Sequence, residues 1–283
     1  MILKSAIDAL ASVLFAAPCR VCGQALTTVS RIPVCAACLD EFERIVDPVC
    51  SCCGRPMATS PGGDVPAARP VNAPLHEALC RLCRADFYAF DQARSFAIYD
   101  RALSEIVLLL KYEQVISLAN WFGDRLAEMV LREGAEQRVD VVVPVPLHRD
   151  RHRERGYNQA ELIARAVAKR MHLPLDSSLL VRIKPRPSQL VLSRTEHWKS
   201  VRGAYATRPG KKIDNLRVLL VDDVLTTGAT LDACSRALKK AAAAAVVGVT
   251  VGRVRFGQAT AVPASTVHSN SATKRARRRI YNS

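Results

Sequence analysis

Two adjacent aspartates near the end of the chain, Asp222 and Asp223, are candidate functional residues. They follow a run of apolar residues and precede a short segment of threonine, glycine and alanine. The hydroxyls and free amides at the start of a helix bind phosphate, whereas carboxylates repel it. A ribose phosphate can bind to both the carboxylates and the phosphate-binding segment, because neighbouring ribose hydroxyls donate hydrogen bonds to carboxylates, as in dinucleotide-binding folds. The stretch therefore predicts a site for phosphoribosyl pyrophosphate (PRPP) or a related sugar phosphate. The predicted phosphate-binding residues are Thr226, Thr227, Gly228, Ala229 and Thr230.

Eight of the ten cysteines form four C-x-x-C pairs in the first third of the chain. Each C-x-x-C turn directs two thiolates at one tetrahedral ion, so two turns complete a closed, structural zinc site. Four regular pairs without a convincing signal sequence favour two zinc ions over disulfides or redox-active pairs. Pairing in sequence order resembles a double zinc ribbon, and a cross-braced pairing is the alternative. The predicted ligands are Cys19, Cys22, Cys35, Cys38, Cys50, Cys53, Cys80 and Cys83, which leaves Cys52 as a spare thiol.

Basic residues gather in two segments of the chain. The sequence PVPL at 144–147 leads into HRDRHRERGYNQ, in which every second residue from 149 to 155 is an arginine. Guanidinium groups in pairs suit pyrophosphate or a nucleic-acid backbone, although such a segment also occurs as a solvated loop. The last ten residues hold five further lysines and arginines. We interpret them as a solvated tail, with contact to nucleic acid or another anionic surface as the alternative.

Alternating strands and helices must position these residues. Three valine-rich segments, 139–145, 217–221 and 246–254, predict buried strands, and apolar residues at helical spacing predict helices over 102–134, 160–171 and 229–241. This alternation predicts an α/β fold, a mainly parallel sheet with helices on both faces. Ligands of such sheets bind beyond the carboxyl ends of the strands. We expect the two aspartates to lie just beyond such an end.

The composition indicates a globular protein. The chain has 283 residues, 49% of them hydrophobic, and a formal net charge of +15. This length accommodates one large and one small domain. No apolar run reaches the roughly 18–20 residues that cross a bilayer. The first residues resemble a signal peptide, but their apolar side chains recur at helical spacing, which favours an amphipathic helix and a cytoplasmic location.

Several motifs together resemble the competence protein F (ComF) family of type I phosphoribosyltransferase-like proteins. They are the four cysteine pairs, Lys111-Tyr112, PVPL, RGYNQ at 155–159, the Gln189/Leu192 region, GAY at 203–205 and the Asp-Asp-x-x-x-Thr-Gly-x-Thr segment. The resemblance implies a phosphoribosyltransferase-like domain over 87–256, preceded by a helix and double zinc ribbon over 1–86 and followed by a basic tail over 257–283. It also implies PRPP bound with magnesium. The candidates for contacting the pyrophosphate are Lys111, Pro144, Pro146, Arg149 and Arg155.

The same resemblance implies a role in DNA uptake or nucleotide metabolism. One hypothesis is a phosphoribosyltransferase, an enzyme of the glycosyltransferase class. The alternative is a non-catalytic protein with a PRPP site that binds single-stranded DNA beside a helicase-like competence protein. Where the family carries Thr, Arg and Asn in its flexible loop, this chain has Arg186, His197 and Ser200. A receiver domain is excluded, because it requires an acidic phosphoacceptor on a later strand and no Asp or Glu follows Asp232.

Overall fold

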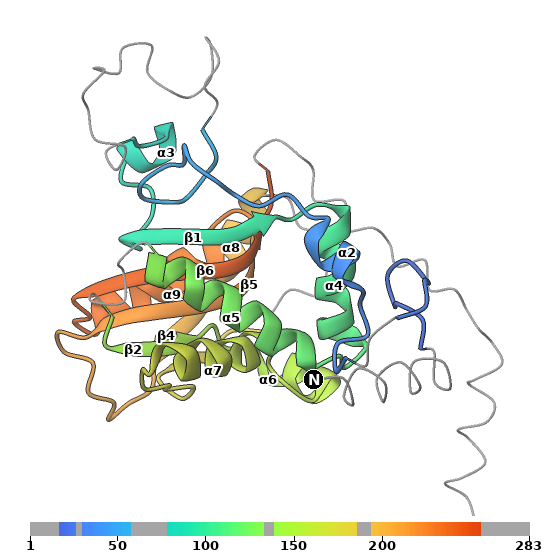
Figure 1. The fold of residues 1–283 in the computed structure, drawn as a ribbon. Helices are drawn as coiled ribbons and strands as arrows, with labels where there is room; N and C mark the ends of the chain where they lie inside the picture. The colour runs from blue at the N-terminus through green and yellow to red at the C-terminus, as the bar shows by residue number, and fades with distance from the viewer. Residues whose placement is uncertain (1–16, 27–29, 58–77, 133–138, 186–193, 256–283) are drawn as a thin grey trace, which may run out of the picture.

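Four parallel strands form the central sheet of the protein (Figure 1). The structure is a computed structural model that describes residues 17–26, 30–57, 78–132, 139–185 and 194–255. The predicted α/β architecture with a parallel sheet is confirmed. Across the sheet the strands follow the order β1 (Gln92–Ile98), β6 (Ala245–Arg253), β5 (Arg217–Leu225) and β2 (Val141–Pro144).

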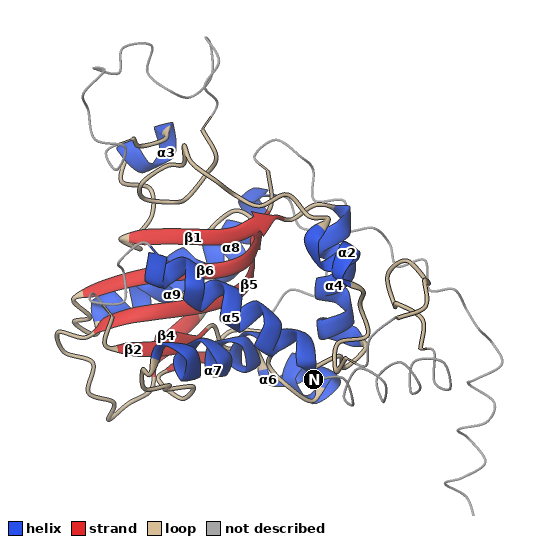
Figure 2. Cartoon of the chain, in the orientation of Figure 1, coloured by secondary structure: helices blue, strands red, loops and turns tan. Residues whose placement is uncertain are grey.

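Helices cover both faces of this sheet, as Figure 2 shows. Successive side chains of a strand point to opposite faces. In β5, Leu219 and Val221 belong to one buried core, and Val218 and Leu220 belong to the other. The first core also holds side chains of α4 (Arg101–Tyr112), α5 (Ser117–Arg132) and α7 (Gln159–Met171). The second holds side chains of α8 (Arg194–Val201), α9 (Ala229–Lys240) and the antiparallel pair β3 (Leu180–Arg182) and β4 (Tyr205–Thr207).

Three elements differ from the sequence prediction. The helix expected over 102–134 is divided into α4 and α5, because Gln114 adopts a left-handed backbone with φ 57°. The basic segment is not a loop but the short helix α6 (Arg149–Arg155), which ends at Gly156 with φ 82°. Strand β1 was not predicted, because QARSFAI shows no alternation of apolar and polar residues. The backbone of Glu43 and Ile45 forms hydrogen bonds with the outer side of β1 and covers this edge of the sheet.

The cysteine pairs flank the sheet and enter its two cores. Cys19 and Cys38, at the start of the chain and in α2 (Ala36–Asp40), share the core of α4 and α5. The four cysteines around α3 (Arg81–Arg84) share the core of α9. Figure 1 accordingly places α2 beside α4, and α3 beyond the β1 edge. A domain boundary at 86/87 stays a prediction.

Some predicted features lie outside the described residues. They are the N-terminal helix, the tail over 257–283, and Arg186, Gln189 and Leu192 of the predicted flexible loop. Within the described ranges, no helix combines the length and the apolar character needed to cross a membrane.

Candidate functional site

The loop that follows β5, residues 226–230, opens helix α9 and is called the phosphate loop below. Gly228 is the N-terminal cap of α9 and has φ 83°, a conformation that suits glycine. A Cβ at this position would lie 2.6 Å from Cε1 of Tyr88. The first-turn amides of a helix have no partner within the helix, and its dipole is positive at this end. The Thr227 hydroxyl accepts a hydrogen bond from one of these amides, Ala229 N, at 3.3 Å.

The two aspartates lie within β5 and not beyond its end, so the expected position is wrong. They alternate like other strand residues and face opposite sides of the sheet. Asp223 contacts Lys111 of α4 and Gln159 of α7. Asp222 lies on the side of α9, where its charge interacts with Arg182 and Cys234. The two carboxylates therefore have separate surroundings.

Asp223 is the acceptor in a buried ion pair. Its Oδ2 lies 2.8 Å from Lys111 Nζ and accepts a 2.8 Å hydrogen bond from Gln159 Nε2. The side chains of Asp223 and Lys111 are 9% and 17% exposed. Burial alone raises the pKa of Asp223, but Lys111 and the two hydrogen bonds outweigh it and leave this pKa below its usual value. The pKa of Lys111 is raised by the same partner against its own burial.

Asp222 has the opposite electrostatic character. Burial raises the pKa of this carboxyl, and the neighbouring Asp223 carboxylate raises it further. The backbone amide of Asp223 donates to Asp222 Oδ1 at 2.8 Å and partly offsets the effect, as does the positive charge of Arg182. The residue is half-buried, whereas Asp223 is 7% exposed. Of the two carboxylates, Asp222 is the more accessible to a ligand.

The RGYNQ segment joins the scattered motifs into one site. Its first residue, Arg155, stacks its guanidinium 4.9 Å from the ring centroid of Tyr112 and donates to Gln159. Tyr157 donates its hydroxyl hydrogen to the carbonyl of Leu110. Asn158 donates to Val145 O, within PVPL, at 3.0 Å and caps α7 through Ala160 N. The motif therefore holds the end of α4, the PVPL turn and β5 together.

Two of the pyrophosphate candidates border a cavity of about 640 Å³ between the PVPL turn and the β3–β4 pair. Pro146 and Arg149 line it, together with Arg182 and Arg208 from the opposite side. Pro144 is the last residue of β2 and pairs with Val221. Lys111 and Arg155 lie with Asp223 instead. Four of the five predicted candidates thus divide into an ion-pair group and a cavity-lining group, and Pro144 lies in the sheet.

Sequence reasoning missed three residues of this region. Gln159 closes the RGYNQ motif, but its contact with Asp223 depends on the fold. Arg182 lies on β3, in a segment for which no strand was predicted. His197 Nδ1 lies 3.1 Å from the Thr227 hydroxyl, although the sequence marked His197 only as a departure from the family pattern. Gln159 and His197 lie in segments that the sequence marked, but their contacts depend on the fold, and Arg182 had no signal of its own.

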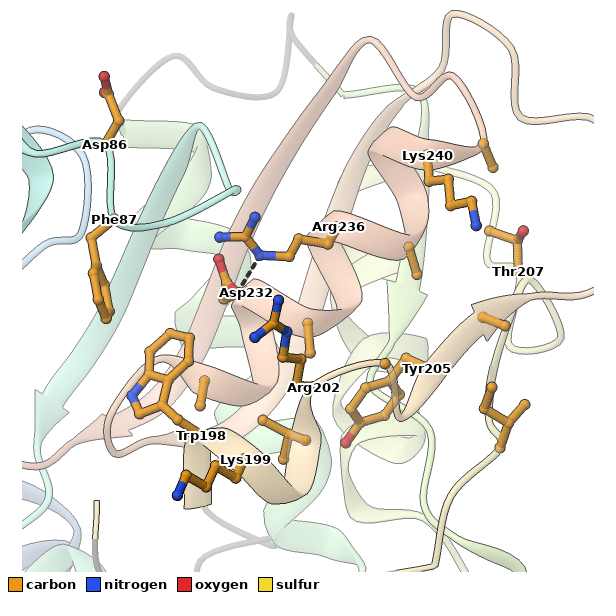
Figure 3. A pocket seen from close by; sticks show the side chains of 18 of the residues that line it. Asp86, Phe87, Trp198, Lys199, Arg202, Tyr205, Thr207, Asp232, Arg236 and Lys240 are labelled. Carbon is orange, nitrogen blue, oxygen red and sulfur yellow. Dashed lines mark hydrogen bonds and ion pairs between the residues drawn. The ribbon is translucent and has the colours of Figure 1, made fainter. Parts of the chain in front are cut away.

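A larger groove of about 1410 Å³ runs along α9 (Figure 3). Phe87 and Trp198 stand at one end of it, with ring centroids 4.9 Å apart. Cationic side chains project into it from α8 and the segment after it, and from α9. They are Lys199, Arg202, Arg236 and Lys240, of which Arg236 is ion-paired with Asp232.

The eight predicted metal ligands form two four-cysteine groups. In each, all four sulfur atoms lie within 4.8 Å of one another, and the pairing follows the sequence order. Tetrahedral zinc with bonds of about 2.3 Å requires sulfur atoms about 3.8 Å apart. Neighbouring sulfurs lie 4.0 and 3.7 Å apart in one group and 3.8 Å in the other. Backbone amides also donate to Sγ of Cys19 and Cys50 at 3.3 Å, and such hydrogen bonds favour the thiolate form. Both groups could hold a metal ion, and their chemistry fits zinc.

Comparison with known proteins shows which proteins the chain resembles. The family model for the phosphoribosyl transferase domain matches residues 157–276. Competence protein ComFC of Bacillus subtilis is 27% identical over 227 residues, which cover 78% of this chain and 84% of that protein. DNA utilization protein YhgH of Salmonella typhimurium is 29% identical over 205 residues, 70% of this chain and 87% of that protein. The chain is similar to ComF and YhgH proteins along most of its length, and its second half matches the phosphoribosyl transferase domain.

The resemblance to ComF proteins is therefore confirmed, with its phosphoribosyltransferase domain. Among solved structures, glutamine PRPP amidotransferase from B. subtilis aligns with 48% of this chain at 22% identity and a TM-score of 0.32. The alignment covers 26% of that chain. The similarity to ComF proteins rests on the sequence matches.

Proposed function

We propose that this ComF-like protein binds PRPP at the carboxyl end of β5. The observation that carries the proposal is the direct succession of an accessible carboxylate, Asp222, and the glycine-capped start of α9 on one strand–loop–helix unit. The ribose hydroxyls donate to Asp222, and the amides of the phosphate loop hold the 5-phosphate. Asp223 is already bonded to Lys111 and Gln159, so its role is to fix Lys111 beside the ligand.

The pyrophosphate end of PRPP needs positive charge. Arg149, Arg182 and Arg208 line the cavity beside the PVPL turn, and the charge of Arg182 reaches Asp222. Magnesium, when bound with PRPP, neutralises pyrophosphate oxygens, and the Asp222 carboxylate is the kind of hard oxygen ligand that it accepts. Transfer of the phosphoribosyl group would further require the surrounding residues to exclude water from the reacting carbon.

Calorimetric titration with PRPP and magnesium tests the proposal. Asp222→Asn removes a hydrogen-bond acceptor that is charged above its raised pKa of about 8. At about pH 9 the change is expected to weaken PRPP binding about 10- to 150-fold, from about 1.5–3 kcal/mol per charged hydrogen bond. Asp140→Asn is the matched control, because Asp140 is ion-paired with Arg217 at the opposite end of β5. Binding of inorganic phosphate should be nearly unchanged in both. A wild-type protein that ignores millimolar PRPP would contradict the proposal.

A second candidate function, binding of single-stranded DNA, is favoured by the groove along α9. Exposed cations reach into the groove from two sides, and Phe87 and Trp198 present aromatic surface at one end. Phosphates bind such cations through release of counterions, and unpaired bases stack on aromatic rings. A protein with this groove would suit work beside a helicase-like machine that translocates DNA.

Salt-dependent binding of a single-stranded oligonucleotide tests the second candidate. Arg202→Gln with Lys240→Gln should reduce the slope of log affinity against log salt by roughly two phosphate contacts. Trp198→Ala should cost about 1–3 kcal/mol of stacking. Arg165→Gln serves as control, because Arg165 is exposed on α7 and paired with Glu161. Deleting residues 271–283 tests the tail separately. Equal loss in the control, or binding of an acidic peptide in preference to DNA, would contradict this candidate.

A further inference from the structure

A short aromatic segment, residues 86–90, connects the second four-cysteine group to the phosphate loop. It leaves the turn of the last cysteine pair, where Asp86 N donates to Cys83 O at 3.2 Å and Phe87 N donates to Leu82 O at 3.3 Å. It then leads into β1. Two of its residues contact α9 or the phosphate loop, as described below.

Tyr88 contacts the backbone of the phosphate loop directly. Its hydroxyl donates to the carbonyl oxygen of Thr227 at 3.2 Å, and its ring occupies the space beside Gly228 that a Cβ would need. The ring also stacks on Phe90 with centroids 4.7 Å apart, which fixes its orientation. Because a trans peptide unit is planar, its C=O and N–H point in opposite directions. By accepting the Tyr88 hydroxyl hydrogen, the Thr227 carbonyl points toward Tyr88, so the Gly228 N–H of the same peptide unit points away from Tyr88.

Ala89 supplies a second tie, to the first turn of α9. Its backbone N–H donates to Asp232 Oδ1 at 2.8 Å, and Asp232 is 3% exposed. The amide of Asp232 in turn donates to Gly228 O at 2.9 Å. Adjacent residues of one segment therefore hold both the carbonyl before Gly228 and the helix turn that follows it.

The other end of this connection is anchored at the second four-cysteine group, Cys50, Cys53, Cys80 and Cys83. All four cysteines are buried. The carbonyl of Cys52 accepts from Ala93 N of β1 at 2.6 Å, and the carbonyl of Cys53 accepts from the buried Arg253 of β6 at 2.6 Å. The group is thus fixed to the sheet on one side and continues into residues 86–90 on the other.

The first four-cysteine group, Cys19, Cys22, Cys35 and Cys38, makes different connections. It borders the turn between α4 and α5 through an ion pair of Arg20 with Glu113 and a hydrogen bond from the Ser117 hydroxyl to Arg31 O, both exposed. Neither contact involves the phosphate loop.

We propose that Tyr88 is a positioning residue for the phosphate loop, and that metal in the second four-cysteine group sets the affinity for 5-phosphate ligands through it. The proposal rests on the proposed function of this loop. Metal loss at the second group releases residues 86–90, so that the Gly228 N–H is no longer held toward the ligand. Metal loss at the first group leaves the loop unchanged.

Two substitutions test the role of Tyr88. Tyr88→Phe keeps the ring against Gly228 and removes only the hydroxyl, so binding of ribose 5-phosphate should weaken about 2- to 12-fold, the value of one neutral hydrogen bond. Zinc content should not change. Ser95→Ala is the control, because it removes another buried hydroxyl bond of the same sheet, to Thr250 at 2.6 Å. Equal affinities of wild type and Tyr88→Phe for ribose 5-phosphate would overturn the role of Tyr88.

Two cysteine substitutions of matched burial test the role of the metal. Cys83 and Cys38 are 6% and 5% exposed, and either Cys→Ser change should lower zinc content from two ions to one per chain. Only Cys83→Ser should also weaken ribose 5-phosphate binding, by at least the factor found for Tyr88→Phe. Because coupling between two sites is reciprocal at equilibrium, ribose 5-phosphate should reduce the equilibrium release of one zinc ion from the wild-type protein to a competing chelator.

The outcomes separate this inference from the proposed function. If wild type binds PRPP and ribose 5-phosphate but neither ligand affects zinc release, and Cys38→Ser and Cys83→Ser bind alike, the coupling is overturned while the PRPP site stands. If Cys83→Ser does not fold, the zinc-release measurement on wild type still decides. If wild type binds neither ligand, the proposed function and this inference fall together.

Discussion

The two four-cysteine groups have the same ligands and the same sequential pairing, yet the structure gives them different surroundings. In the second group every cysteine is buried, and buried hydrogen bonds connect it to β1 and β6. In the first group Cys22 is exposed and Cys35 half-buried, and its contacts with the α4–α5 turn are exposed. A C-x-x-C repeat thus predicts the coordination of an ion, but the surrounding elements decide what that ion can influence.

The two four-cysteine groups have different surroundings because they pack in the cores on opposite faces of the sheet. The first group adds Cys19 and Cys38 to the core beneath α4 and α5, at the end of α4 that carries Lys111. The second group adds all four cysteines to the core beneath α9, the helix that begins at the phosphate loop. Each group therefore packs in the core beside one half of the proposed site, and the second group is also hydrogen-bonded to the sheet through buried contacts.

Stepwise removal of metal should give the largest contrast. A chelator should take the ion of the first group before that of the second, because Cys22 is exposed and the second group is closed to solvent. Loss of the second ion should coincide with local unfolding of the cysteine turns around α3, since structural zinc contributes about 10–16 kcal/mol in small zinc domains. Zinc release and circular dichroism, followed together, measure both steps. Cys52→Ser should change neither. Simultaneous loss of the two ions would contradict the expectation that the exposed first group releases its ion before the buried second group.

The buried ion pair at the end of α4 gives the next largest effect. Lys111→Met leaves the Asp223 carboxylate buried without its cation, which costs about 3–5 kcal/mol. Adding Asp223→Asn should restore most of this stability, because no uncompensated charge remains. Urea unfolding of the three proteins measures the effect. A destabilisation as small as that of a surface change would show that solvent already reaches the pair.

The pH dependence of this pair has a definite sign. The pKa of Asp223 is lowered in the folded protein, so its stabilising contribution is present above the unfolded carboxyl pKa and is lost as the pH falls through the folded value. The double variant lacks that contribution at every pH. Its stability should therefore decline less than that of wild type between pH 6 and about 3, around the usual carboxyl pKa of about 4.

Much of this arrangement was predictable from the sequence, and the rest depends on contacts across the fold. Apolar runs identified β2, β5 and β6, and C-x-x-C spacing identified the metal ligands. Strand β1 was not predicted, because an edge strand with arginine and serine has no alternating pattern. The contact of Tyr88 was not predicted, because its partner lies 139 residues away. The two aspartates were assigned one common role, since their adjacency in sequence conceals that neighbouring strand residues face opposite sides.

Arg253 tests the buried link of the second group to the sheet. Its guanidinium donates to Cys53 O at 2.6 Å and lies 3.7 Å from Cys53 Sγ. Arg253→Gln should cost about 1.5–3 kcal/mol, the value of a hydrogen bond to a charged group, and should accelerate zinc loss from the second group. Unfolding by urea and chelator kinetics provide the two readouts. Unchanged zinc release would mean that the sheet holds the group by packing alone.

The smallest effect is expected at the corresponding link of the first group. Arg20 and Glu113 form an ion pair whose side chains are 44% and 45% exposed. Exposed pairs contribute about 0–1 kcal/mol, because water screens the charges and two long side chains lose freedom. A double-mutant cycle of Arg20→Gln and Glu113→Gln should therefore give a coupling energy below about 1 kcal/mol that vanishes in high salt. The affinity for PRPP should stay at the wild-type value, because Glu113 caps α4 without contacting Lys111 or Asp223 in the described part of the chain. A loss of PRPP affinity in Arg20→Gln that matches Lys111→Met would show that the first group also positions the ligand site, through the end of α4.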